Sequence, residues 1–182
     1  FYLPNIIGGL ILGFVWQFIF INGVPAIGKL LHFGPLMTPW LGTEMTAYAA
    51  IVIVSVWQGM GYVMVIMIAA LTGISSELVE AAKIDGANGW KTFWKITVPL
   101  LKPTIIMTFI MSINGTLQLF DESVNLTKGG PANSTITMSH YIYNTCFINV
   151  PNFGYAAAMS FIIFIMVAVL AFINLKVGDT RD

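Results

Sequence analysis

The stretch EAAKIDGANGWKTFWKITVPLLKP, residues 80–103, is the densest cluster of charge in an otherwise apolar chain. The 182 residues are 57% hydrophobic and 9% charged, whereas roughly 25% of the residues of a soluble domain are charged. This composition indicates a membrane protein in which the quoted segment lies outside the hydrocarbon. The alternative is a water-soluble protein with buried apolar helices, but the chain offers too few polar residues to cover such a core.

Four apolar stretches are long enough to cross a bilayer, which takes about 20 helical residues. We expect spanning helices at about 1–21, 46–72, 99–120 and 153–175. The third is entered through Pro99 and Pro103, which are tolerated near a helix start. The chain opens inside an apolar run without a starting Met, so we expect N-terminal helices to be missing. The expected fold class is an all-α membrane protein, a polytopic bundle of transmembrane helices.

Basic residues alternate between the segments that join these helices. Lys29 is the only basic residue of loop 22–45, and Lys128 is the only one of loop 121–152. The other six lie in segment 73–103 and in the C-terminal tail: Lys83, Lys91, Lys95, Lys102, Lys176 and Arg181. Lysine and arginine in short loops favour the cytoplasmic side. We therefore expect segment 74–98 and the C-terminus in the cytoplasm, and the other two loops outside.

The charged segment itself has the pattern of two helices joined by a bend. Ser75 or Ser76 can cap a helix whose first turns contain Glu77 and Glu80, where the helix dipole favours negative charge. Glycines then interrupt the helix at positions 86 and 89. Aromatic residues recur at helical spacing beyond them, with lysines on the other side: Trp90, Phe93 and Trp94 against Lys91 and Lys95. A plain connecting loop whose aromatic face rests on lipid headgroups has the same pattern.

The order of residues in this segment also resembles a known motif. It reads Glu80-Ala81-Ala82, three residues, Gly86, nine residues, Ile96, one residue, and Val98-Pro99. This order resembles the EAA loop of permease subunits from binding-protein-dependent ABC importers. The longer form found in carbohydrate permeases is matched at Asp85-Gly86-Ala87, Phe93, Pro99 and Pro103. Two departures are Val98, where leucine is usual, and four helices where such permeases have about six.

The resemblance extends along the chain, through residues 126–131, Tyr143, Phe147 and residues 154–158, to the maltose and glycerol-phosphate branch of these permeases. It implies the maltose-type permease fold and ATP-driven, alternating-access import of a carbohydrate across the cytoplasmic membrane of a bacterium or archaeon. The implied partners are a second permease subunit in a heterodimer, two ATP-binding cassette ATPases and an extracytoplasmic sugar-binding protein. The coupling residues it implies are Glu77, Glu80, Ala81, Ala82, Asp85, Gly86 and Ala87.

The chain is not expected to be an enzyme, and ATP hydrolysis is assigned to the partner subunits. Its nearest approach to a phosphate loop, residues 86–92, has Trp90 between the glycine and the lysine and fails the required spacing. No cofactor or metal is expected, because His32 and His140 have no carboxylate or thiol beside them. The single Cys146 excludes an internal disulfide, and the zero net charge gives no indication of nucleic acid.

The expected spans have no charged residue in their central parts, which argues against proton relays and cation sites. Neutral polar and aromatic side chains instead share faces of the second and third helices and suit a hydroxyl-rich ligand. The resemblance favours the following as sugar-lining residues: Trp57, Gln58, Gly59, Tyr62, Ser112, Thr116 and Leu119. The same residues could equally hold helices together, and Asn114 and Gln118 form a competing face. Gly9 and Gly13 form a small-residue pair suited to packing against another helix.

Other functions share part of this pattern. An ion-coupled secondary transporter should have buried ionisable residues and an inverted repeat, neither of which is found in the sequence. An assembly subunit could bind an ATPase through the EAA loop without contacting a solute. An ABC permease for a non-sugar solute, such as a polyol phosphate, would have the same loop. The sequence does not name the sugar.

Overall fold

The computed structural model describes the backbone of residues 2–179 and the side chains of residues 2–176, and every regular element in it is helical. Phe1 of the first expected helix and Arg181 of the basic tail lie outside the described residues. The α-helices are α1 (Leu3–Ile6), α2 (Gly9–Phe18), α3 (Val24–Leu31), α4 (Gly34–Met37), α5 (Glu44–Thr72), α6 (Ser76–Ile84), α7 (Gly89–Thr92), α8 (Val98–Leu117), α9 (Met138–Tyr143) and α10 (Phe153–Asp179). Four π-helical turns interleave them: η1 (Ile19–Gly23), η2 (Phe93–Thr97), η3 (Glu122–Leu126) and η4 (Asn144–Ile148).

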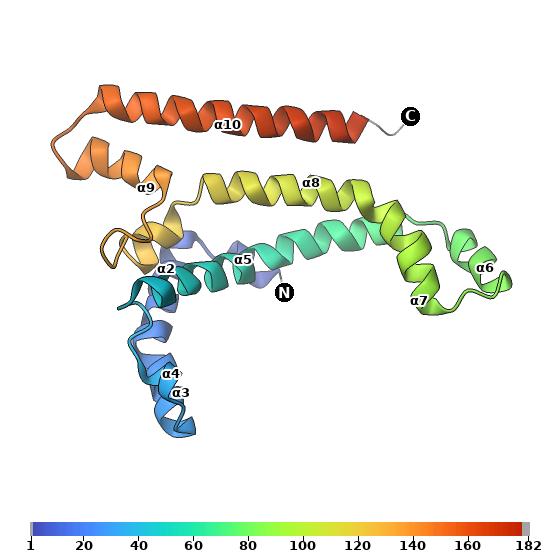
Figure 1. Cartoon of the computed structure of the whole chain (residues 1–182), viewed down its shortest axis with the longest axis horizontal. Helices are drawn as coiled ribbons and strands as arrows, with labels where there is room; N and C mark the ends of the chain where they lie inside the picture. The colour runs from blue at the N-terminus through green and yellow to red at the C-terminus, as the bar shows by residue number, and fades with distance from the viewer. Residues whose placement is uncertain (1, 180–182) are drawn as a thin grey trace.

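The three longest helices form the body of the molecule. Helix α8 contacts α5 on one side and α10 on the other, and the three run along the long axis (Figure 1). Four helical runs in the described chain are long and apolar enough to cross a membrane: Gly9–Leu31, Glu44–Thr72, Gly89–Leu117 and Phe153–Lys176. The all-α bundle expected from the sequence is therefore what the structure contains. Most of the apolar surface of these helices stays exposed, as lipid or other subunits would require.

The first helical run differs from the helix expected at 1–21. Helix α1 stops at Ile7, which is extended, and α2 begins after Gly8. The helix then continues to Leu31, through the stretch expected to be a loop. Pro25 lacks an N–H group but sits in the first turn of α3, directly after the wide turn η1, where that group is not needed.

The helix α3 ends at His32, whose backbone is left-handed with φ 51°. Close packing against α4 follows, because the backbone of Leu36 lies directly beside Gly28. Helices α3 and α4 together form a short hairpin that leaves the body of the bundle at the end opposite α6 (Figure 1). Part of the expected outer loop 22–45 is therefore helical.

The third helical run begins earlier than the expected position 99. Helix α7, the turn η2 and helix α8 are continuous from Gly89 to Leu117. Pro99 lies in the first turn of α8 and Pro103 lies inside it. The amphipathic helix expected after the glycines is thus the beginning of the spanning helix rather than a separate element.

The buried core lies where α2, α5 and η3 meet. It is formed by the following side chains: Leu12, Phe20, Ala50, Ile51, Val54 and Leu126. The side chain of Asp121 lies against Gly9, and that of Asn125 lies against Gly13. The small-residue pair of the first helix does pack closely, but its partner is the segment that begins at Asp121 and continues through η3. This contact fixes the 121–152 loop to the bundle.

Candidate coupling loop and translocation face

Helix α6 begins as the sequence predicts. The hydroxyl of Ser75 accepts a hydrogen bond from the backbone N–H of Glu77 at 3.2 Å, so Ser75, rather than Ser76, is the N-cap. Glu77 lies in the first turn, where the exposed N–H groups of the helix favour its negative charge. The cap therefore fixes where α6 starts relative to the end of α5 at Thr72.

The bend after α6 is a closed helix-ending motif. Gly86 is left-handed with φ 76°, a conformation that costs other residues free energy. The N–H of Ala87 donates to the carbonyl of Ala82 at 2.9 Å, and that of Gly86 donates to the carbonyl of Lys83 at 3.1 Å. This pair of bonds is a Schellman motif, which satisfies carbonyls that the last helical turn leaves free. The chain then restarts at Asn88, whose side chain caps α7 by accepting from the N–H of Lys91 at 2.9 Å.

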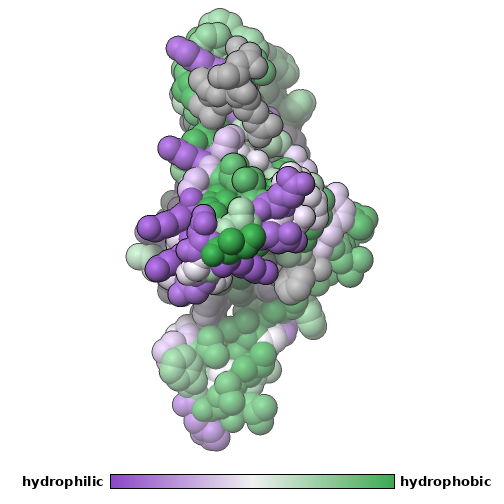
Figure 2. Space-filling view, turned by 90° about the vertical axis from the view of Figure 1, so that its right-hand side faces the viewer, coloured by the Kyte–Doolittle hydropathy of each residue, from purple (hydrophilic) through white to green (hydrophobic). Residues whose placement is uncertain are grey.

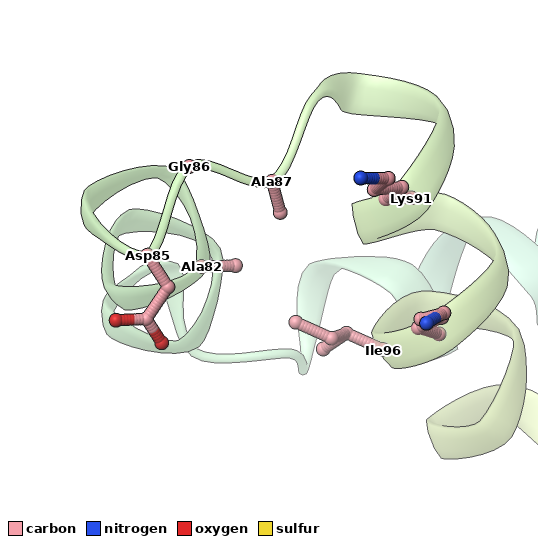
Figure 3. A pocket seen from close by; sticks show the side chains of 7 residues that line it. Ala82, Asp85, Gly86, Ala87, Lys91 and Ile96 are labelled. Atoms are coloured by element: carbon pink, nitrogen blue, oxygen red, sulfur yellow. The ribbon is translucent and has the colours of Figure 1, made fainter.

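The bend brings α6 and α7 together around a notch of about 260 Å³. The side chains of Ala82, Ala87 and Ile96 point toward this space, and Lys91 reaches it from α7 (Figure 3). Asp85 lies on the far side of the notch from Lys91 (Figure 3). Ala82 is buried, so small residues on this side of α6 allow the two helices to approach each other.

The opposite side of α6 is its free surface. At 100° per residue, side chains two or five positions from Ala82 point to the opposite side of the helix. These side chains are Glu80 and Ile84, at two positions, and Glu77, at five. Ile84 is 87% exposed, an unusual position for a large aliphatic side chain. Figure 2 looks onto this end of the molecule, where hydrophilic residues surround a small apolar patch. Ile84 is not among the residues expected from the sequence, although an isoleucine between Lys83 and Asp85 stands out in a charged segment.

The coupling residues expected from the sequence thus divide into two groups. Ala82 is buried on the notch side, and Ala87 is half-buried beside it. The remaining five are exposed: Glu77, Glu80, Ala81, Asp85 and Gly86. Ala82 and Ala87 pack inside the bend that Gly86 turns, whereas Glu77, Glu80 and Asp85 place carboxylates on the exposed surface, where Ile84 is exposed too.

On α5, the residues expected to line a solute path are near the middle of the helix. Trp57 and Tyr62 are partly exposed, and Gln58 and Gly59 are half-buried. The ring of Trp57 meets that of Trp16 edge to face at 5.2 Å. The side chain of Asn5 donates to the backbone carbonyl of Gln58 at 3.4 Å. The aromatic platform is therefore held by α2, and the amide of Gln58 is not used in that bond.

On α8, the two expected hydroxyl residues bond to their own helix. Ser112 donates to the carbonyl of Thr108 and Thr116 donates to that of Ser112, both at 2.9 Å. Each hydroxyl is exposed and keeps lone pairs that can accept from a ligand. Leu119 lies beyond the end of α8 and packs against the buried core. The structure therefore places Ser112 and Thr116 on an exposed face of α8 and Leu119 against the core.

The competing face of α8 contains Asn114. Its side-chain oxygen is buried and has no hydrogen-bond partner among the described residues. Asn114 borders a cavity of about 910 Å³ between α8 and α10, together with Met107 and Asn174. Gln118 is exposed at the C-cap of α8. Both faces of α8 thus present polar groups.

The 121–152 loop is locked by buried hydrogen bonds. The Ser123 hydroxyl donates to the carbonyl of Thr135 at 2.7 Å, so it must accept from the Nδ1–H of His140, also at 2.7 Å. It also accepts from the backbone N–H of Thr137 at 3.4 Å. Burial lowers the pKa of His140. His140 is therefore held by the loop's own hydrogen bonds, and in the described part of the chain no group of three His, Cys, Asp or Glu could hold a metal ion.

The charged loop at residues 74–98 and the Gly-Gly-Pro turn at residues 129–131 lie at opposite ends of the bundle (Figure 1). This arrangement defines a class: a multi-pass membrane protein with a helix–bend–helix at one end and a rigid loop at the other. The chain belongs to the family of binding-protein-dependent transport system inner membrane components, whose family model matches residues 1–178.

Individual members of this family and one solved structure are similar to the chain over most of its length. The chain is 40% identical, over 182 residues, to a probable starch degradation products transport system permease protein of Thermoanaerobacterium thermosulfurigenes, covering 100% of this chain and 62% of that protein. It is 49% identical, over 156 residues, to the lactose transport system permease protein of Rhizobium radiobacter, covering 84% and 52% respectively. The crystal structure of a bacterial ABC transporter involved in the import of alginate matches with a TM-score of 0.79 at 22% identity, over 98% of this chain and 62% of that chain. The chain thus spans between about half and three-fifths of the length of these relatives.

Proposed function

We propose that the chain is the permease subunit of an ATP-driven importer that moves a carbohydrate across the cytoplasmic membrane by alternating access. The observation that carries this proposal is the geometry of α6. A capped helix with a closed bend behind it is a rigid body, and its free face presents Glu77, Glu80 and Ile84 to a partner. The names of two relatives refer to the transport of starch degradation products and of lactose, which supports a carbohydrate substrate.

The lysine distribution supports placing α6 in the cytoplasm. There, its free face would dock into a cleft on an ATPase, with Glu80 paired to a basic residue and Ile84 filling an apolar pocket. Docking would bury the exposed side chain of Ile84, and side chains that are fully desolvated near the centre of an interface contribute most of its binding energy. Closure of two ATPases around ATP would then move α6, and with it α5 and α8. A second permease subunit would complete the pathway, and an extracytoplasmic sugar-binding protein would deliver the solute.

The sugar would pass along the faces of α5 and α8. Trp57 and Tyr62 offer aromatic surfaces to the apolar faces of a sugar, whereas Gln58, Ser112 and Thr116 offer hydrogen bonds to its hydroxyls. Gly59 leaves open space beside them, since a Cβ there would have no neighbour within 4 Å. Leu119 packs against the core beside this face and, being half-buried, would add an apolar contact.

The test measures, in the reconstituted complex, whether the ATPases stay bound and whether ATP hydrolysis stays coupled to uptake. We expect Glu80→Ala, Gly86→Leu and Ile84→Ala to weaken co-purification of the ATPases and to uncouple ATP hydrolysis from uptake. Ile84→Ala should raise the Kd of the ATPase by roughly thirtyfold, the effect of losing about 2 kcal/mol at an interface centre. Leu78→Ala is the matched control, because Leu78 lies on the other side of the same helix. Unchanged co-purification and uptake in all three variants would contradict the proposal.

The carbohydrate is tested separately. Uptake across a panel of labelled sugars should identify the substrate, and Gln58→Ala should change the uptake rate or the order of preference among them. If Gln58→Ala left both untouched while the α6 variants abolished uptake, the pathway would lie elsewhere, and Asn114 would be the next residue to test.

A further inference from the structure

An exposed aromatic cluster lies at the start of the third helical run, on α7 and η2. Trp90 is 71% exposed, Trp94 is 52% exposed and Phe93 is 44% exposed. The rings contact one another, with centroids 5.8 Å apart for Trp90 and Trp94 and 5.3 Å apart for Phe93 and Trp94. Three large aromatic side chains held together at the surface form a preorganised apolar patch that needs a partner.

Positive charge lies beside this patch without an acidic neighbour in sequence. Residues 86–120 contain Lys91, Lys95 and Lys102 and no aspartate or glutamate. Lys91 and Lys95 are exposed and four residues apart, and each directly follows a tryptophan of the cluster, Trp90 or Trp94. Asp85, the nearest carboxylate in the sequence, lies across the notch (Figure 3). The surface of α7 and η2 is therefore amphipathic and cationic.

The position of this surface along the helix indicates what it binds. It lies on the first two turns of the continuous helix Gly89–Leu117, which is apolar enough to span a bilayer. Tryptophan rings favour the level of the headgroups at a membrane surface, and lysines near the cytoplasmic leaflet attract anionic lipids. The free face of α6, in contrast, lies beyond the bend at residues 85–88. The aromatic patch thus lies at the expected depth of the phospholipid headgroups.

We propose that α7 and η2 form a binding surface for anionic phospholipid of the cytoplasmic leaflet, with Lys91 and Lys95 on the phosphate and the aromatic cluster in the headgroup region. This inference rests on the cytoplasmic orientation in the proposed function. Lys91 and Lys95 also border the notch beside Ala82 of α6. The bound headgroup therefore lies next to the coupling helix and steadies the base on which that helix turns.

The experiment uses the whole complex in proteoliposomes of phosphatidylglycerol and phosphatidylcholine in equal parts. Bromine atoms, which quench tryptophan fluorescence on contact, are placed on the acyl chains of one lipid or of the other, so that the overall composition stays the same. The signal of Trp90 and Trp94 is obtained by subtracting that of the variant Trp90→Phe/Trp94→Phe, which lacks only these two of the five tryptophans. The measured quantity is the ratio of quenching by the two brominated lipids.

We expect this ratio to favour phosphatidylglycerol severalfold, since each lysine near the surface enriches anionic lipid about fivefold. Lys91→Gln/Lys95→Gln should bring the ratio close to one. The matched control Lys29→Gln/Lys176→Gln removes two exposed lysines elsewhere and should leave it unchanged. A wild-type ratio of one, or a ratio that survives loss of Lys91 and Lys95, would overturn the inference. So would the absence of quenching by either lipid, because a protein partner would then cover the patch.

Quenching is read without ATP or sugar, so it stands apart from transport. A complex that imports sugar but shows no preference between the lipids contradicts only the lipid surface. A complex that shows the preference but neither binds ATPases through α6 nor imports sugar contradicts only the proposed function.

Discussion

Two glycines with nearly the same backbone angle show how differently the two end loops are built. Gly86 in the 74–98 loop has φ 76°, and Gly129 in the 121–152 loop has φ 77°. A Cβ built on Gly86 would meet nothing within 4 Å. A Cβ built on Gly129 would lie 2.8 Å from the side chain of Ile136 and 3.2 Å from that of His140. The first glycine serves only the backbone turn, whereas the second also makes room for packed side chains.

The hydrogen bonds follow the same contrast. The 121–152 loop has a buried centre at Ser123 and is fixed to α2, where Gln17 donates to the carbonyl of Leu126 at 3.3 Å. The 74–98 loop is held by its helix caps and by the bend, and its largest side chains face outward. One loop completes its own structure, and the other leaves a surface for partners. In the function that we propose, force enters through the 74–98 loop, and the exposed side chains of that loop leave it free to contact a partner.

The largest effect on stability is expected at Gly129. Gly129→Ala places a residue in the left-handed region and pushes it into Ile136, which together should cost about 3 kcal/mol. Gly86→Ala is the matched control, because it has the same backbone angle without the contact, and it should cost about 1 kcal/mol. Thermal unfolding of the purified protein in detergent measures both. Equal losses in the two variants would mean that the loops do not differ in packing.

The next largest effect is expected at Ser123. Ser123→Ala leaves the Nδ1–H of His140 and the N–H of Thr137 without their acceptor, at a cost of about 2 kcal/mol. Ser134→Ala, at an exposed serine of the same loop, should change the unfolding temperature little. If both variants unfolded at the wild-type temperature, the buried hydrogen bonds would not be what holds this loop.

Local features of the charged loop could be predicted from the sequence because they depend on neighbouring residues. The cap at Ser75 and the bend at Gly86 each follow from rules that act over a few residues, whereas the helix expected to start near Pro99 begins ten residues earlier, at Gly89. The fold class could be predicted as well, because the composition and the lengths of the apolar stretches are read directly from the sequence. The free face of α6 could not be predicted from the sequence. It depends on the burial of Ala82, which in turn depends on how the bend places α7 against α6.

Contacts between distant residues were beyond such rules. The pair Gly9 and Gly13 indicated close packing, but the partner segment at Asp121 and Asn125 is more than a hundred residues away. The same limit applies to the solute path. Periodicity placed Gln58 and Thr116 on faces of their helices, yet a path is completed by other helices and subunits. The sequence of one chain therefore predicts which residues share a helix face better than it predicts which residues enclose a solute path.

A smaller effect is expected from pH at His140. Burial lowers the pKa of His140 below its ordinary value of 6.5, so the unfolded loop takes up a proton more readily than the folded one. The stability is complete above that value and falls as the pH drops below it, until the folded His140 also becomes protonated. Unfolding temperatures measured from neutral pH to about pH 5 should show this loss. In His140→Asn, whose amide can still donate to Ser123, the loss should be reduced; an identical pH profile would assign it to another group.

The smallest effect on the whole protein, and the sharpest test of the open loop, is expected at the cap of α6. Ser75→Ala removes the bond to Glu77 and should weaken this helix by about 1 kcal/mol. Because α6 is mostly exposed, this loss should remain local, leaving the unfolding temperature unchanged while amide hydrogen exchange in residues 76–84 speeds up about fivefold. Ser76→Ala, one residue further on, removes no cap and should exchange as the wild type does. If Ser75→Ala instead lowered the unfolding temperature as Ser123→Ala does, α6 would unfold together with the bundle, and the 74–98 loop would not be the more open of the two end loops.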